Sequence, residues 1–271
     1  MAERDYRRLP GERYDLSAID PSDTGDYEGK KKGEKELEKR REVLLELQRK
    51  LHVDGRNSLL VVLQAMDCAG KDGTIRHVLG AFEPQGTQVA SFKVPSEEER
   101  AHDFLWRIHK AVPRLGMVGI FNRSHYEEVL VVRVKELKPE AVWRTHFEHI
   151  NNFERLLAES GVTIVKIFLH ISPEEQAERL RDRQQRPEKQ WKFSPGDLED
   201  RVRWKSYMAA YEEALTLCNT DHAPWYVVPA DKKWHRNLVV SEILIETLKN
   251  MDLQYPDPVA DIDSYVIPDI E

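Results

Sequence analysis

The chain has 271 residues and a formal net charge of −7 at pH 7, with 33% charged and 40% hydrophobic residues. This composition is ordinary for a globular protein, and the acidic balance argues against a dedicated nucleic-acid binder. No apolar run approaches the roughly 20 residues that span a bilayer, and the polar start shows no signal-peptide pattern. Cys68 and Cys218 form neither a disulfide framework nor a zinc site, so we expect a cytoplasmic protein without a membrane partner.

Composition and periodicity predict three parts along the chain. Residues 1–55 are an extended arm followed by an amphipathic helix at Lys31–Leu51, residues 56–251 form the core, and residues 252–271 are an extended tail. Core strands are predicted at Leu59–Gln64, Gln88–Phe92, Met117–Phe121, Val162–His170 and Trp225–Val228. Core helices are predicted at Thr74–Phe82, Glu97–Val112, His125–Val134, Pro139–Ser160, Pro173–Arg186, Leu198–Thr216 and Asp231–Met251. This alternation predicts an α/β fold, a three-layer sandwich of a five-stranded parallel sheet with helices on both faces.

The first predicted strand leads into Asp67-Cys68-Ala69-Gly70-Lys71-Asp72-Gly73-Thr74, which has the features of a phosphate-binding loop. A buried strand, a Gly-Lys loop and a helix are the phosphate-loop unit of P-loop proteins. Backbone N–H groups at Gly70–Thr74 and the Lys71 ammonium would bind an anion at a helix N-terminus. The general pattern is incomplete, because Ala65 stands where glycine is usual and Asp72 where a hydroxyl residue is usual. A surface loop with a solvated lysine is the alternative.

A second polar element follows the strand that ends at Phe121. Asn122 and Arg123 come at its carboxyl end, where ligands bind in open α/β sheets, so both should face the phosphate loop. P-loop enzymes keep a magnesium-binding Asp here, and Asn122 is a poorer ligand. We therefore expect Asp67 to hold Mg²⁺, with Glu127 or Glu128 as a compensating carboxylate. The alternatives are that Asp67 caps a helix or pairs with lysine and that the two glutamates only begin a helix.

Basic residues cluster between the fourth strand and the next long helix, and the cluster extends into a proline-bounded loop at residues 187–195. The cluster contains Arg179, Arg181, Arg183, Arg186, Lys189 and Lys192. In nucleoside monophosphate kinases a basic lid closes on the transferring phosphoryl group and excludes water. We predict a basic helical lid at about residues 179–197. A solvated charged helix is the alternative.

These motifs together resemble the polyphosphate kinase 2 family over nearly the whole chain. The matching runs are Asp67–Thr74, Phe121–Glu128, the lid pattern from Arg179 to Asp197, Ala223–Val228 and Asp231–Lys233. The resemblance implies a P-loop kinase-like fold and reversible phosphoryl transfer from inorganic polyphosphate to a nucleotide, with Mg²⁺ as cofactor. Asn122 and the run His125-Tyr126-Glu127 resemble the subgroup that accepts both nucleoside monophosphates and diphosphates. A homodimer or homotetramer is also implied.

For such a transfer we expect catalytic roles for Asp67, Lys71, Arg123, Arg179 and Arg183. Phosphate or nucleotide contacts are expected from Ala69, Gly70, Lys71, Asp72, Gly73, Thr74, Lys93, Arg107, Asn122, Arg123, Glu127, Arg133, Lys189 and Lys192. Asp67 and Glu127 are the expected Mg²⁺ ligands. The expected acceptors are ADP and GDP, together with AMP and GMP.

Two alternatives stay open at this point. An ATP-dependent nucleoside monophosphate kinase would have a similar sheet, loop and lid, and only the phosphate donor would differ. A binding protein without catalysis is supported by Asn122 alone, and intact Asp67, Lys71 and lid arginines argue against it.

Overall fold

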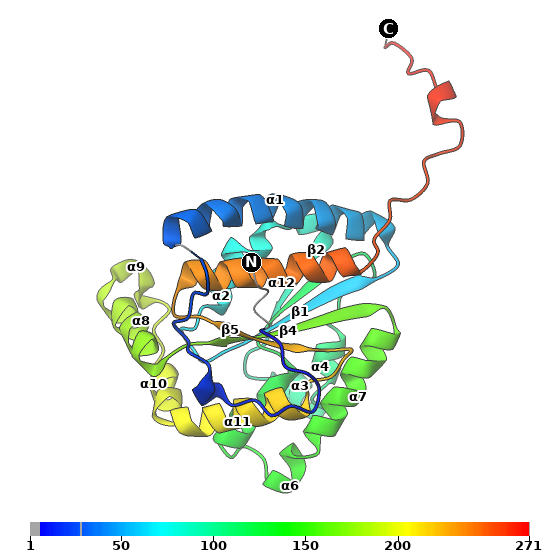
Figure 1. Ribbon diagram of the computed structural model, residues 1–271. Coiled ribbons are helices and arrows are strands. Elements are labelled where there is room, and N and C mark those ends of the chain that lie inside the picture. Colours follow the sequence, from blue (N-terminus) through cyan, green and yellow to red (C-terminus); the bar gives the residue numbers. More distant parts are fainter. Residues whose placement is uncertain (1–5, 28, 271) are drawn as a thin grey trace.

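The computed structural model describes residues 6–27 and 29–270, arranged as a parallel sheet between two layers of helices (Figure 1). The strands are β1 (Ser58–Gln64), β2 (Thr87–Ser91), β3 (Val118–Asn122), β4 (Val162–His170) and β5 (Trp225–Pro229). Their order in the five-stranded sheet is β2-β3-β1-β4-β5, and every neighbouring pair is parallel. The predicted fold class is confirmed.

Helices connect the strands and cover both faces of the sheet. The α-helices are α1 (Lys30–Asp54), α2 (Lys71–His77), α3 (Glu97–Ala101), α4 (Trp106–His109), α5 (Val131–Val134), α6 (Glu140–Trp143), α7 (His146–Glu159), α8 (Pro173–Gln185), α9 (Pro187–Gln190), α10 (Pro195–Val202), α11 (Trp204–Leu217) and α12 (Lys233–Asn250). Short 3₁₀ turns are η1 (Leu16–Ala18), η2 (Leu79–Ala81), η3 (Pro84–Gly86), η4 (His125–Glu128) and η5 (Ile262–Ser264). Helices α1 and α12 lie together on one face, and α7 and α11 lie on the other (Figure 1).

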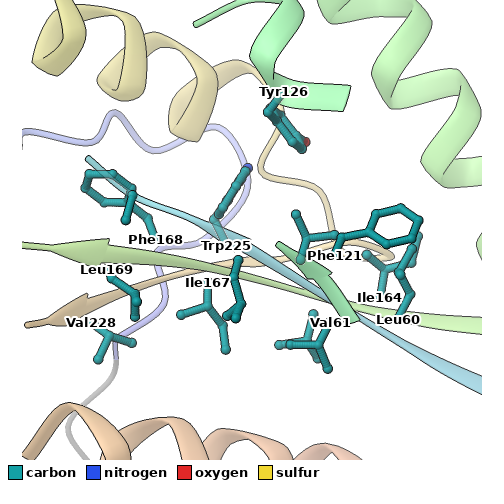
Figure 2. Close-up of a cluster of buried hydrophobic side chains, with 14 of the residues drawn as sticks. Leu60, Val61, Phe121, Tyr126, Ile164, Ile167, Phe168, Leu169, Trp225 and Val228 are labelled. Atoms are coloured by element: carbon teal, nitrogen blue, oxygen red, sulfur yellow. The ribbon is translucent and has the colours of Figure 1, made fainter. Parts of the chain in front are cut away.

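The central strands read as continuous apolar runs because both of their faces are buried. All residues of β1 are buried, and β4 is buried apart from one intermediate position. Side chains alternate between the two layers, as the pleat requires. Figure 2 shows Ile167 and Val228 pointing toward one helical layer while Phe168 and Trp225 point toward the other. The sheet is therefore fixed in position by packing on both sides.

Several helices that the periodicity predicts as continuous are broken in the structure. The predicted helix at Glu97–Val112 is the two short helices α3 and α4, separated by a turn in which the Asp103 carboxylate accepts a hydrogen bond from the Leu105 N–H. The predicted helix at His125–Val134 is a 3₁₀ turn followed by α5, with the Ser124 hydroxyl capping the turn. Shorter breaks also divide the predicted helices at Pro139–Ser160 and Leu198–Thr216. Local side-chain caps override the longer periodicity.

The predicted arm lies along the outer edge of β5. The Val227 N–H donates to the Tyr6 carbonyl, and the buried Tyr14 hydroxyl donates to the Trp225 carbonyl. Residues 1–5 of this arm, Glu28 and Glu271 lie outside the described residues. The tail after α12 extends away from the body (Figure 1). Among the residues that are described, none of the helices combines the length and apolarity needed to cross a bilayer.

The contact between α1 and α12 makes Gly33 a sensitive position. A Cβ atom there would lie 2.5 Å from Cε3 of Trp234, so Gly33→Ala must displace the indole or the helix. We expect this variant to lower the free energy of unfolding by about 1–3 kcal/mol, although alanine normally stabilises a helix. Urea denaturation measures the change.

Gly196→Ala in α10 is the matched control, because its Cβ would meet only Ser194 Oγ at 3.4 Å. This variant should be neutral or more stable by up to about 1 kcal/mol. Equal stabilisation of both variants would contradict the packing argument.

Candidate active site

A cleft of about 1850 Å³ lies beyond the carboxyl ends of the strands. Open α/β sheets bind their ligands at this edge. The lining includes the loop after β1, the ends of β2 and β3, the helices α8–α10 and the first turn of α12. Sequence-predicted residues on its wall are Asp67, Gly70, Lys71, Asp72, Gly73, Lys93, Asn122, Arg123, Arg179, Arg183, Lys189 and Lys192.

The loop between β1 and α2 folds tightly around the lysine side chain. Cys68 and Gly70 both have positive φ, 67° and 112°, which lets the chain turn from the strand into the helix within a few residues. Lys71 is 8% exposed, and its Nζ donates to the Ala65 carbonyl at 2.8 Å. Burial lowers the pKa of Lys71, and the nearby Asp67 charge opposes that shift. Thr74 is fully buried in α2, with no hydrogen-bond partner for its hydroxyl among the described residues.

Asp67 is the negative centre of this cleft wall. Arg123 Nη2 donates to Asp67 Oδ1 at 2.6 Å, and Lys71 Nζ lies 3.9 Å from the same oxygen. Burial would raise the pKa of Asp67, but the charges of Lys71 and Arg123 outweigh it and lower the pKa. Arg123 reaches Asp67 from a left-handed backbone conformation with φ 61°, directly after β3. Such strain persists only where the surrounding structure fixes it.

Asn122 contacts the phosphate loop through its amide. Its Nδ2 donates to Asp72 Oδ1 at 2.9 Å and ties the end of β3 to the start of α2. A carboxylate at position 122 would face Asp72 and repel it, because two like charges at hydrogen-bond distance destabilise each other. Asn122 and Asp72, which both depart from the general P-loop pattern, therefore compensate each other.

The two expected Mg²⁺ ligands differ in how well they fit a cation. Asp67 lines the cleft with its pKa lowered, so it presents a carboxylate that suits a hard cation. Glu127 lies behind Arg123, 3.9 Å from its Nη1, and does not line the cleft. Burial raises the pKa of Glu127 against the opposing charge of Arg123. Within residues 6–27 and 29–270, no three His, Cys, Asp or Glu side chains cluster as a metal site.

A buried ion-pair network holds the turn after β3 in place. Lys166 Nζ on β4 donates to Glu154 Oε2 at 2.5 Å, to the Tyr126 hydroxyl at 2.8 Å and to the Cys218 carbonyl at 2.6 Å. His125 Nε2 lies 3.1 Å from Glu154 Oε1, which also accepts from the Tyr126 hydroxyl. Burial would raise the pKa of Glu154, but the Lys166 charge and the His125 hydrogen bond lower it. The network anchors η4 and so fixes the position of Arg123, which lies just before this turn.

Arg179, Arg183 and Lys189 of the predicted lid have hydrogen-bond or ion-pair partners within the protein. Arg183 Nη1 lies 3.1 Å from Asp197 Oδ2, and Lys189 pairs with Asp182. Arg179 is 8% exposed and donates to the carbonyls of Cys68, Ala69, Ala230 and Asp231. Arg179 therefore braces the phosphate loop, while Arg183 and Lys189 line the cleft with their charges paired.

Five of the expected residues do not line the cleft. Ala69 and Thr74 are fully buried in the loop and in α2. Arg133 pairs with Glu213 and packs over the Trp143 ring. Arg107 donates to the Lys93 carbonyl and packs over Phe92. Glu127 is the fifth. Of the two predicted residues near the second strand, only Lys93 lines the cleft.

Sequence reasoning gave no role to a second set of cleft cations. These come from the first turns of α1 and α12 and from α2, namely Lys30, Lys35, Arg76, Lys232, Lys233 and Arg236. The run Asp231-Lys232-Lys233 was recognisable as a motif at the carboxyl end of β5. That position alone is a signal for ligand contact. The cations of α1 have no such signal, because only the packing of α1 on α12 brings them to the cleft.

Comparison with known proteins gives the family. The family model described as Polyphosphate kinase 2 (PPK2) matches residues 27–256. A Meiothermus ruber protein named AMP/ADP-polyphosphate phosphotransferase is 53% identical over 97% of this chain and 98% of its own length. A Rhodopseudomonas palustris protein named ADP-polyphosphate phosphotransferase is 44% identical over 94% of this chain and 92% of its own.

A solved structure agrees with these relatives. The crystal structure of Polyphosphate Kinase 2 from Arthrobacter aurescens TC1 superposes with a TM-score of 0.90 at 43% identity, covering 97% of each chain. The chain belongs to the polyphosphate kinase 2 family, and the resemblance drawn from its motifs is confirmed.

The buried network predicts a large effect of removing its lysine. Lys166→Met leaves Glu154 buried without its charge partner, and we expect a loss of about 3–5 kcal/mol in the free energy of unfolding. Lys39→Met is the control, since Lys39 and its partner Glu36 are 67% and 41% exposed, and such a surface pair contributes only about 0–1 kcal/mol. Equal losses in urea denaturation would contradict the network's role.

The raised pKa of Asp197 predicts that the stability of the fold depends on pH. Burial and the charge of Asp67 raise the pKa of Asp197 to about 6, against an ordinary 3.8, so the folded state holds this proton more tightly than the unfolded chain. The resulting stability is fully present below the ordinary value and is lost as the pH rises through about 6. Wild-type protein should therefore lose stability relative to Asp197→Asn between about pH 4 and pH 7 in urea denaturation. A constant difference would count against the raised pKa.

Proposed function

We propose that this member of the polyphosphate kinase 2 family transfers phosphoryl groups reversibly between inorganic polyphosphate and nucleotides. The proposed acceptors are ADP and GDP, together with AMP and GMP. One observation carries the proposal: a single cleft joins the loop amides, Lys71, Asp67 and Arg123 to the predicted lid, a basic hairpin of residues 179–197 at the carboxyl ends of the strands. The name of the Meiothermus ruber relative supports both AMP and ADP as acceptors.

The cations at one end of the cleft support a polyanionic donor. Lys30 and Lys35 come from the start of α1, and Lys232 and Lys233 come from the start of α12, beside α8 and α9 in Figure 1. A protein with a net charge of −7 needs such local positive charge to bind a polyphosphate. Lys93 lines the cleft at the end of β2 and extends this basic wall. We propose that the donor chain runs along the α1 and α12 end.

The transfer itself requires positioning and charge neutralisation. A terminal phosphate oxygen of the nucleotide attacks the end phosphorus of the donor in line, forming one P–O bond while the bridging P–O bond breaks. The shortened polyphosphate leaves with that electron pair. Because the attacking phosphate is already anionic, no general base is needed. Holding both phosphates at near-attack distance therefore accounts for much of the rate enhancement.

The side chains divide this work between the loop and the hairpin. The amides of Gly70–Thr74, Lys71 and Arg123 hold the phosphates where donor and acceptor meet. Arg183, Lys189 and Lys192 neutralise the charge that develops during transfer, and arginines in this role contribute about 10³–10⁵ in rate in related chemistry. Arg179 acts on the loop from behind, as its four carbonyl contacts support. We propose that residues 179–197 act as a lid over the core of residues 56–251.

We propose Mg²⁺ as the cofactor, held by Asp67 together with phosphate oxygens and water. Bound there, the ion would neutralise phosphate charge and orient the reacting groups. With a cation there, Asp67 would no longer need Arg123 as its counter-charge, and the guanidinium would be free for a phosphate. Glu127 keeps Arg123 on the cleft side from behind rather than binding the ion itself.

We also propose that the protein is a cytoplasmic homodimer or homotetramer. Exposed apolar side chains along α6, α7 and α11 support a contact between copies. They are Val142, Leu156 and Leu217, which are 43%, 52% and 47% exposed.

Product analysis with purified protein and Mg²⁺ tests the function. With polyphosphate as the only donor, AMP should be converted to ADP and then to ATP. Conversion of ADP alone would retain the family activity and remove the monophosphate acceptor. Phosphorylation of AMP by ATP but not by polyphosphate would contradict the proposal in favour of a nucleoside monophosphate kinase.

Lys71→Ala and Asp67→Ala connect that activity to the cleft. Turnover should fall by about 10³ or more, because each variant removes a charge at the transferring phosphate. Arg49→Ala is the control, since Arg49 forms a surface pair with Glu83 and is 57% exposed. Wild-type turnover in either cleft variant would place the chemistry elsewhere.

A further inference from the structure

Arg236 is a buried cation against the back of the phosphate loop. It lies in the first turns of α12, is 2% exposed, and still borders the cleft. Its Nη1 donates to the Ala69 carbonyl at 3.1 Å, while Nε and Nη2 donate to Asn237 Oδ1 at 3.2 and 2.9 Å. Among the ion pairs of the described residues none includes Arg236. A full positive charge is thus held by neutral acceptors only.

The guanidinium packs closely against the loop because the loop is glycine there. A Cβ atom at Gly70 would overlap Arg236 Nη1, and one at Gly73 would lie 3.0 Å from Nη2. The arginine therefore requires glycine at position 70 and leaves little room for a side chain at position 73. The loop and the arginine form one packed unit.

The contact with Ala69 also orients the amide that should meet a phosphate. In a planar trans peptide the carbonyl of one residue and the N–H of the next point in opposite directions. The Ala69 carbonyl accepts from both Arg179 Nη1 and Arg236 Nη1, so the Gly70 N–H points away from these two cations. Two guanidinium groups thus orient the Ala69–Gly70 peptide so that its N–H, the positive end of the peptide dipole, points away from them.

The buried charge of Arg236 is energetically unfavourable in the ligand-free protein. Burial, with the charge of Arg179 second, lowers the pKa of Arg236 to about 9. Arg179 has the Glu175 carboxylate at 2.8 Å, but Arg236 has only the Asn237 amide. A buried charge without a counter-ion is unfavourable, and an anion bound nearby relieves it.

We infer that Arg236 is a positioning residue whose charge stays uncompensated until a phosphate binds the loop, so that phosphate affinity, more than folding, depends on it. The inference rests on the proposed function for the identity of the anion. It predicts opposite effects on the free and bound protein: compensating or removing the charge stabilises the free fold or leaves it unchanged, and weakens phosphate binding.

Asn237→Asp is the sharpest test, because it is nearly isosteric and places a carboxylate where Oδ1 already accepts from Arg236. Calorimetric titration with tripolyphosphate should show a dissociation constant raised about tenfold or more, as expected for cancelling one nearby charge. Urea denaturation of the ligand-free variant should show equal or greater stability. Arg236→Gln should weaken binding in the same direction.

Ser91→Asp is the matched control, because it adds the same charge to the cleft wall away from α12. Its effect on binding should be smaller and strongly reduced by salt. Binding by Asn237→Asp that matches Ser91→Asp, or lost stability with unchanged affinity, would overturn the inference and leave Arg236 a structural residue. Wild-type protein that binds neither tripolyphosphate nor pyrophosphate would instead overturn the proposed function.

Discussion

Charge balance without a ligand is the constraint on which the phosphate site depends. The loop gathers Lys71, Arg123, Arg179 and Arg236 around a few backbone amides, and these cations repel one another because three of them are buried. Asp67 supplies the counter-charge, accepting from Arg123 at 2.6 Å with Lys71 at 3.9 Å. The carboxylate thus occupies the electrostatic place of a phosphate until one arrives.

The fold supplies this arrangement through the order of its strands. β1 is flanked by β3 and β4, so the loop, Arg123 and the start of the basic hairpin all emerge at one edge of the sheet. The Lys166–Glu154 pair then fixes the turn after β3 from below, through Tyr126 and His125. Helix α12 closes the back of the loop by inserting Arg236. Each cation is thus held by a different element.

The sequence predicts best the strands, which are apolar runs between two layers of helices. All five strands are predicted within about a residue or two of their ends, the usual boundary uncertainty, since apolar runs buried on both faces leave a clear pattern. The breaks at Asp103 and Ser124 are missed because a single local hydrogen bond from the backbone to a side chain there outweighs periodicity. In the site, Asp67, Lys71 and Arg123 come together as strand ends require. Arg133 does not reach the cleft, and Arg236 could not be found, because each depends on which helix packs beside it.

The hairpin shows how an acidic protein can bind a polyanion. Two of its cations that line the cleft are already paired in the absence of ligand, Arg183 with Asp197 and Lys189 with Asp182. At these two positions phosphate binding would exchange one anionic partner for another instead of adding a contact, which limits the net free energy that each contributes. Selectivity must then come from cations that have no internal partner to give up. Arg236 meets that condition and Arg183 does not, so the inferred contribution of Arg236 to phosphate affinity comes from the back of the loop, with no internal ion pair to break.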